Sequence, residues 1–132
     1  MNCLLDTHTL LWTVLDTGKL SAVAKSAILD TGNDIHVSAV SFWEISLKYS
    51  TGRLELKGIL PDDFPKISAD MGFSILELMP DTVATSYKLP KIQNNDPFDR
   101  LIAWQAIKSS LSLISCDKAF DDYTKYDLKR IW

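Results

Sequence analysis

The chain has 132 residues, of which 46% are hydrophobic and 23% charged, and these ordinary globular values exclude a disordered chain. The length fits a single domain spanning residues 1–132. A net charge of −3 excludes broad electrostatic coating of nucleic acid, although it leaves room for a local basic patch. No apolar run exceeds four residues, which is too short for a membrane span or for the core of a signal peptide.

Short apolar runs alternate with longer amphipathic stretches along the whole chain. In chain order, the predicted elements are strand 2–5, helix 7–15, helix 21–30, strand 35–37, a helix from 38 or 41 to 49, helix 61–71, strand 73–76, helix 80–89, helix 96–110, strand 112–115, a helical turn at 118–122 and strand 128–131. Ser21 is suited to capping the second helix, and either Ser38 or Ser41 to starting the third. The alternation predicts an α/β fold with a parallel sheet covered on both faces, in which sites gather at the carboxyl ends of the strands.

Two cysteines are too few for a disulfide framework. Cys3 and Cys116 lie in apolar segments, so we expect free, buried thiols in a reducing, cytoplasmic compartment. Because no pair of cysteines or histidines has ligand spacing, we do not expect a zinc site.

Four acidic residues fall where such sheets build sites. Asp6 and Asp117 directly follow predicted strands, Glu44 lies one turn into the helix after the second strand, and Asp99 lies in the first turn of the helix from Pro97. All four are thus expected at one rim of the sheet. Clustered carboxylates repel one another, so they raise each other's pKa or recruit a cation, and oxygen ligands favour Mg²⁺ or Mn²⁺ over zinc. Such an ion can activate water and stabilise charge on a phosphodiester.

Each acid also has a purely structural interpretation. Asp6 and Asp117 are suited to capping the helices that follow them, and Asp99 interacts favourably with its helix dipole after the cap at Asp96. Glu44 is spaced to pair with Lys48 four residues on. It is the coincidence of all four on one rim that favours a functional site.

Three segments carry a resemblance to a known family. They are Leu4-Leu5-Asp6-Thr7-His8, Ser41-Phe42-Trp43-Glu44-Ile45-Ser46-Leu47-Lys48, and Asp96-Pro97-Phe98-Asp99-Arg100-Leu101-Ile102-Ala103. Together with 113–120 they resemble the PIN domain, and within it the VapC-like toxins of bacterial toxin–antitoxin pairs. The resemblance runs in order from about residue 2 to 132.

The resemblance implies a three-layer α/β/α sandwich with a mostly parallel five-stranded sheet, and Mg²⁺- or Mn²⁺-dependent endoribonuclease activity. It assigns the family's four acidic positions, catalytic and metal-binding, to Asp6, Glu44, Asp99 and Asp117. Asp99 is preferred to Asp96 because the family's acid directly precedes an x-Leu-Ile-Ala helix. Homodimers, and inhibition by a cognate antitoxin whose tail enters the active-site groove, are also implied.

One segment departs from the family. Relatives often carry histidine just ahead of the Asp-Pro-Phe-Asp segment, where this chain has Gln93-Asn94-Asn95. The departure affects the expected substrate contacts more than the chemistry, because it removes no carboxylate.

The RNA must be held by local basic groups, because the overall charge is slightly repulsive. We expect these among the residues nearest the predicted rim, namely Lys48, Arg53, Lys91 and Arg100. Two other functions stay open. One is a Mg²⁺-dependent phosphotransfer or phosphatase domain with Asp6 as nucleophile, although Thr7 and His8 stand where such domains place a second acid. The other is a catalytically silent PIN-like module that only binds a protein.

Overall fold

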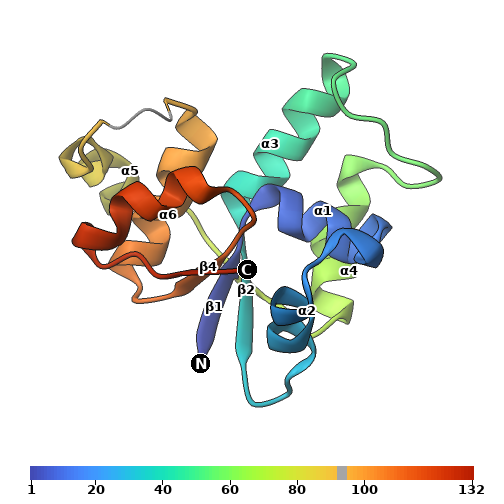
Figure 1. Ribbon diagram of the computed structural model, residues 1–132. Helices are drawn as coiled ribbons and strands as arrows, with labels where there is room; N and C mark the ends of the chain where they lie inside the picture. Colours follow the sequence, from blue (N-terminus) through green and yellow to red (C-terminus); the bar gives the residue numbers. More distant parts are fainter. Residues whose placement is uncertain (92–94) are drawn as a thin grey trace.

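The computed structural model describes residues 1–91 and 95–132, which form a central sheet with helices on both sides (Figure 1). The strands are β1 (Asn2–Leu5), β2 (Asp34–Ser38), β3 (Ser74–Leu76), β4 (Ser112–Ile114) and β5 (Arg130–Ile131). The α-helices are α1 (Thr7–Leu15), α2 (Ala22–Leu29), α3 (Ala39–Ser50), α4 (Phe64–Asp70), α5 (Pro80–Thr85) and α6 (Pro97–Lys108). The 3₁₀ helices are η1 (Thr17–Lys19), η2 (Pro61–Asp63), η3 (Ser86–Lys88) and η4 (Lys118–Tyr126).

The sheet has five strands in the order β3-β2-β1-β4-β5, and every pair is parallel. The central strand is β1, in which Leu5 lies opposite Val37 of β2 and Ile114 of β4. All strands therefore end at the same side of the sheet, which we call the carboxyl edge. The predicted α/β fold with a parallel five-stranded sheet is confirmed.

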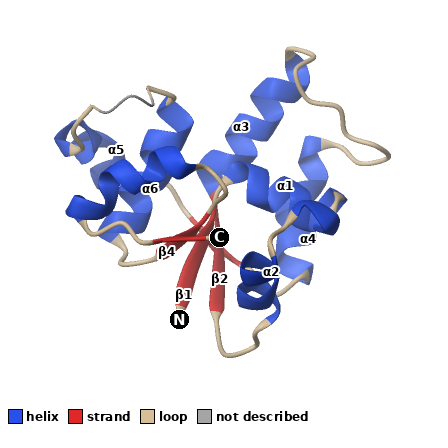
Figure 2. Ribbon diagram, viewed as in Figure 1, coloured by secondary structure: helices blue, strands red, loops and turns tan. Residues whose placement is uncertain are grey.

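Alternate residues of the strands enter two separate cores. Cys3 and Leu5 of β1 pack with apolar residues of α1, α2 and α3, whereas Leu4 packs with residues of α6 and η4. This alternation is expected of a strand whose two faces are both covered. The result is three layers, with α1, α2 and α4 on one side of the strands and α5 and α6 on the other (Figure 2).

The expected capping residues begin several helices. Ser21 accepts a hydrogen bond from the backbone N–H of Ala24, at the start of α2. Of the two serines that were candidates for starting α3, it is Ser38 that caps it, accepting from the N–H of Val40. Such a cap satisfies one of the N–H groups that the first helical turn leaves unpaired.

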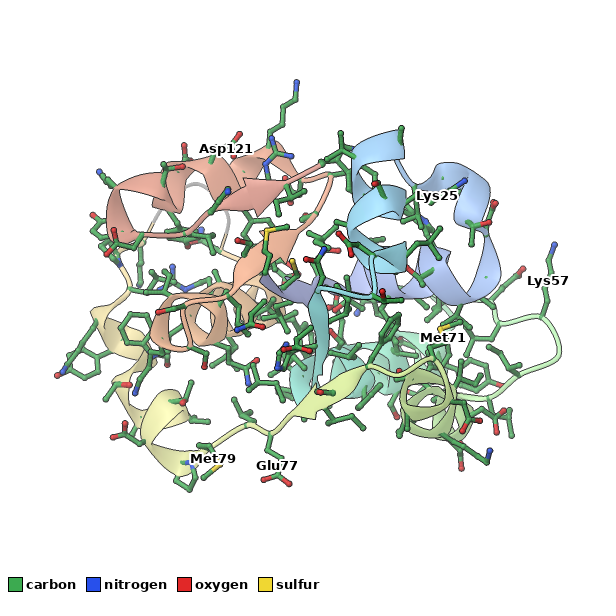
Figure 3. The ribbon with its side chains drawn as sticks, turned by 90° about the horizontal axis from the view of Figure 1, so that it is seen from below. Lys25, Lys57, Met71, Glu77, Met79 and Asp121 are labelled. Atoms are coloured by element: carbon green, nitrogen blue, oxygen red, sulfur yellow. The ribbon has the colours of Figure 1, made fainter. Side chains whose placement is uncertain are left out.

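The end of the chain differs from its predicted elements. The expected turn at 118–122 continues as η4 to Tyr126, and Asp127 then reverses the chain in a left-handed conformation, with φ of 72°. The last strand is limited to Arg130–Ile131 because only these residues pair with β4. The opposite edge strand, β3, is exposed, and Glu77 beyond it points away from the molecule (Figure 3).

The two cysteines are both free. Cys3 is buried, as expected, whereas Cys116 is only half-buried. Within residues 1–91 and 95–132, no helix has the length and apolar character needed to cross a membrane.

Candidate active site

Asp6 is a buried carboxylate at the carboxyl edge. It leaves β1, retains a backbone hydrogen bond to the Ile114 carbonyl of β4, and caps α1 by accepting from the N–H of Thr9 at 2.8 Å. Only 4% of the residue is exposed, and this burial raises its pKa, against the lowering effect of hydrogen bonds from Ser115 and Thr9. Asp6 therefore caps α1, as its structural interpretation predicts, and it is at the same time a desolvated acid at the end of the central strand.

Ser115 connects Asp6 with Asp117. Its hydroxyl donates to Asp6 Oδ2 and accepts from the backbone N–H of Asp117 at 3.0 Å. Asp117 in turn caps η4 by accepting from the N–H of Ala119. The pKa of the intervening Cys116 thiol is raised by burial and then by the negative charges of Asp6 and Asp117. The ends of β1 and β4 thus form one connected group, and the structure brings these two predicted acids together.

Sequence reasoning did not single out Ser115. Its position could have indicated a role, because it ends a strand two residues before Asp117. A short hydroxyl side chain there can bind the neighbouring backbone and also the end of an adjacent strand. Arg130 holds the same segment from the other side, because its Nη1 donates to the Ser115 carbonyl at 3.0 Å while its Nε and Nη2 bind the Asp121 carboxylate.

Glu44 is the second buried carboxylate, with 2% of its side chain exposed. It lies on α3 one turn after Ser41, whose hydroxyl accepts a hydrogen bond from Thr7 of α1 at 3.0 Å. Its Oε2 pairs with the Lys48 ammonium, as the spacing predicted. Its Oε1 is buried and has no hydrogen-bond partner among the described residues. A buried carboxylate oxygen without a donor is costly, so the site lacks one positive or hydrogen-bonding group.

Asp99 lies in the first turn of α6, as predicted, and it is half-buried. The helix is capped by Asp96, which accepts from the N–H groups of Phe98 and Asp99. Phe98 packs edge-on against Trp43, with 4.7 Å between the ring centroids. The residue before Asp99 therefore touches the residue before Glu44, and α6 approaches α3 at this point.

The four predicted acids share one region without forming a closed ligand set. Asp6 and Asp117 are joined through Ser115, Glu44 is held beside α1, and Asp99 begins the helix that packs on α3. In the part of the chain that is described, no three His, Cys, Asp or Glu side chains stand close enough together to hold a metal ion. The donor set nevertheless suits a hard cation, because it consists of carboxylate oxygens and one of them, Glu44 Oε1, has no partner among residues 1–91 and 95–132.

The predicted basic residues differ in their surroundings. Lys48 is paired with Glu44, while Arg53 and Lys91 are exposed. Arg100 binds within the protein, because its guanidinium donates to the carbonyls of Leu89 and Pro90 and to the Tyr123 hydroxyl. This anchoring of the segment before α6 was not expected from the sequence. Of the segment that departs from the PIN pattern, Asn95 is exposed, whereas Gln93 and Asn94 lie outside the described residues.

Comparison with known proteins identifies the family. The family model for the PIN domain matches residues 3–126. The chain belongs to the PIN domain family. PIN domains are generally nucleases and typically use divalent metals, so the class of enzyme indicated is a hydrolase that acts on nucleic acids. A search of curated proteins gives no match.

Two solved structures share the fold of this PIN domain. A structure of VapBC2 from Rickettsia felis bound to a DNA fragment from their promoter has a TM-score of 0.68 and 16% identity, and the match covers 98% of this chain and 97% of that one. A structure of FitAB bound to an IR36 DNA fragment has a TM-score of 0.54 and 18% identity, covering 98% and 93% of the two chains. The resemblance inferred from the three sequence motifs is therefore confirmed for both family and fold.

Proposed function

We propose that this PIN domain is a divalent-metal-dependent endoribonuclease and the toxin of a type II toxin–antitoxin pair. The catalytic part of the proposal rests on the two buried carboxylates, Asp6 and Glu44. One oxygen of Glu44 has no donor among the described residues. The helix cap explains the burial of Asp6, but burying Glu44 with an oxygen that no described residue donates to costs stability, which favours a chemical role over a module that only binds a partner.

The metal would be Mg²⁺ or Mn²⁺, held by Asp6, Glu44 and Asp99, with Asp117 completing the set or supporting a second ion. When bound, the ion supplies Lewis acidity, which lowers the pKa of water and offsets charge on the scissile phosphate. Glu44 Oε1 is suited to bind it, because this oxygen is buried and accepts no hydrogen bond from the part of the chain that the structure describes.

The residues around these acids orient them. Ser115 and Thr9 fix both oxygens of Asp6, so that its carboxylate does not rotate freely. Lys48 neutralises Glu44 and, with Arg53, Lys91 and Arg100, forms the set of basic residues proposed to contact RNA phosphates. Arg100 keeps only part of its donor capacity for this purpose, since both terminal nitrogens bind within the protein.

The proposed partners are a cognate antitoxin and a second copy of the chain, in the cytoplasm. Support for an antitoxin comes from the two structural neighbours, which are the VapBC2 and FitAB assemblies, both bound to DNA fragments. The homodimer rests on the resemblance alone, and sedimentation of the purified chain tests it.

The direct test is cleavage of a structured RNA by the purified chain alone. We expect no cleavage in EDTA, cleavage in Mg²⁺ or Mn²⁺, and products with 5′-phosphate and 3′-hydroxyl ends, because the nucleophile is water. Products with 2′,3′-cyclic phosphate would identify the ribose hydroxyl as nucleophile and overturn the mechanism. The phosphotransfer alternative would instead give an aspartyl-phosphate with acetyl phosphate, and the silent module would give neither reaction.

A further inference from the structure

A pocket of about 500 Å³ lies between α1 and the segment that follows α3. His8 and Trp12 line it from α1, Lys48 from α3, and Arg53 from the turn after α3. It begins beside the carboxylates, because Thr7, which follows Asp6, also lines it. Lys48 is shared by both places, since the side chain that lines the pocket also binds Glu44.

The aromatic wall of this pocket has a fixed orientation. The ring centroids of His8 and Trp12 are 5.9 Å apart, and those of Trp12 and Trp132 are 5.8 Å apart. Trp12 is half-buried against the core on its inner side, whereas His8 is exposed. An aromatic surface held in place by neighbouring rings binds a flat ligand at little entropic cost.

The charged residues of the pocket come from both of its sides, the end of α1 with η1 and the end of α3 with the segment after it. A second hollow adjoins the pocket, and three charged residues of the pocket line it as well: the acids Asp16 and Glu55 and the cation Lys19. These three residues therefore mark the end of the pocket that is far from the carboxylate site. Asp16 lies ten residues after Asp6 along α1, which at about 1.5 Å per residue is roughly 15 Å. The end close to Asp6 and Glu44 carries Lys48, whose ammonium is paired with Glu44, and Arg53 also lines the pocket.

We propose that this pocket binds one nucleotide of single-stranded RNA, with the base against Trp12 and His8 and the flanking phosphate at Lys48 and Arg53. The volume suits a ligand of nucleotide size. Base stacking on aromatic side chains, combined with a local positive charge, is how proteins hold single strands, and a base in a duplex is not free to stack in this way. Cleavage of the bound strand rests on the proposed function, whereas binding of a nucleotide in the pocket does not.

The geometry assigns Lys48 to the junction of the two sites. A phosphate bound by Lys48 lies next to Glu44, so a nucleotide in the pocket places the neighbouring phosphodiester toward the carboxylates. The nucleotide bound in the pocket thus determines which phosphodiester bond of the RNA lies at the carboxylates. Trp12 and His8 are therefore positioning residues.

Binding of a fluorescein-labelled single-stranded RNA of mixed sequence, measured by anisotropy in EDTA, tests the proposal without cleavage. Trp12→Leu is expected to weaken binding about five-fold or more, Trp12→Tyr to restore most of it, and His8→Ala to weaken it less. Arg53→Gln should reduce the slope of log K against log salt by about 0.7, as for one lost phosphate contact. His8 and Arg53 are exposed, so their variants are expected to fold.

Matched variants outside the pocket serve as controls. Tyr87→Leu removes an exposed aromatic side chain from η3, and Lys25→Gln removes a cation from α2 (Figure 3); both are expected to bind RNA like the parent chain. Equal binding by Trp12→Leu, His8→Ala and the parent chain would overturn the proposal, as would equal binding of duplex RNA or loss of binding in the controls.

The two proposals fail separately. If the parent chain cleaves RNA in Mg²⁺ but binding does not depend on Trp12, the pocket is wrong and the nuclease stands. If binding depends on Trp12 but no metal restores cleavage, the nuclease is wrong and the pocket stands as a single-strand binding site.

Discussion

The two edges of the sheet carry the same residue types in opposite environments. At the carboxyl edge, Asp6 is buried, bonded to Ser115, and has a raised pKa. At the amino edge, where β1 and β2 begin, Asp34 is exposed and lies opposite Asn2 in the register of the two strands. An acid at a strand end therefore becomes chemically distinct only where helices enclose it. In parallel sheets the following helices do so at the carboxyl ends.

The largest expected effect is a loss of RNA cleavage when an acid of the carboxyl edge is replaced, but not when an acid of the amino edge is replaced. Asp6→Asn should reduce RNA cleavage at least about 100-fold, because a metal ligand is lost and metal stabilisation of the transition state is worth several kcal/mol. Asp34→Asn removes the same charge from the other edge and should leave cleavage unchanged. Rates measured in Mg²⁺ with both variants check this, and equal rates would refute the assignment of Asp6.

A second effect concerns the buried pair at the carboxyl edge. In EDTA, Lys48→Met should lower the free energy of unfolding by about 1–3 kcal/mol, because it leaves the buried Glu44 carboxylate without a counter-charge. Its matched control is Lys66→Met on α4, where the Lys66–Asp70 pair has the same spacing but is exposed, so that its loss should cost much less than the loss of Lys48.

Urea titrations of both lysine variants measure these values. Adding Mn²⁺ should restore more stability to Lys48→Met than to Lys66→Met, because the ion replaces the missing charge at Glu44. Equal losses for the two variants would show that Glu44 is not a desolvated site.

The link between the strand ends gives a smaller effect. Ser115→Ala should lower the free energy of unfolding by about 1–2 kcal/mol, since it removes a buried donor to Asp6 and a buried acceptor of the Asp117 N–H. It should also raise the pKa of Asp6 further, because the Ser115 hydrogen bond lowers it. Carbon NMR titration of the Asp6 carboxyl follows this shift, with Ser112→Ala in the same strand as control. An unchanged Asp6 titration would contradict the proposed connection.

The smallest expected effect is a pH dependence of stability. Because the folded state raises the pKa of Asp6, its contribution to stability is most favourable at low pH and declines as the pH rises through that raised value. Asp6→Asn carries no charge at any pH, so it should melt above the parent chain at pH 8. The gap should close as the pH falls and Asp6 becomes protonated. Calorimetry across this range checks the sign, which would be reversed if burial did not dominate.

The sequence was most informative where local signals were strong. The apolar run before Asp6 predicted β1, Ser21 predicted the start of α2, and the Asp96 cap predicted α6, because each depends on short-range hydrogen bonding or periodicity. The end of η4 was missed because it depends on Asp127 adopting a left-handed conformation, which aspartate adopts more often than most residues but which no sequence pattern specified at this position.

The positions of the four acids in the fold were predictable from the sequence, but the contacts that surround them were not. Strand-end placement located Asp6 and Asp117, and helix spacing correctly paired Lys48 with Glu44. The bond from Ser115 to Asp6 joins residues 109 positions apart, so it follows from the pairing of β1 with β4 and not from any local pattern. The anchoring of Arg100 by backbone carbonyls is likewise a product of tertiary structure.

The proposed function depends most on a cation bound at the carboxyl edge, and a crystal of the chain soaked in Mn²⁺ tests this directly through anomalous scattering. We predict a peak at about 2.0–2.2 Å from Glu44 Oε1 and from an oxygen of Asp6, with Asp99 and Asp117 turned toward it. A fully occupied peak elsewhere, or none at concentrations that support cleavage, would contradict the account.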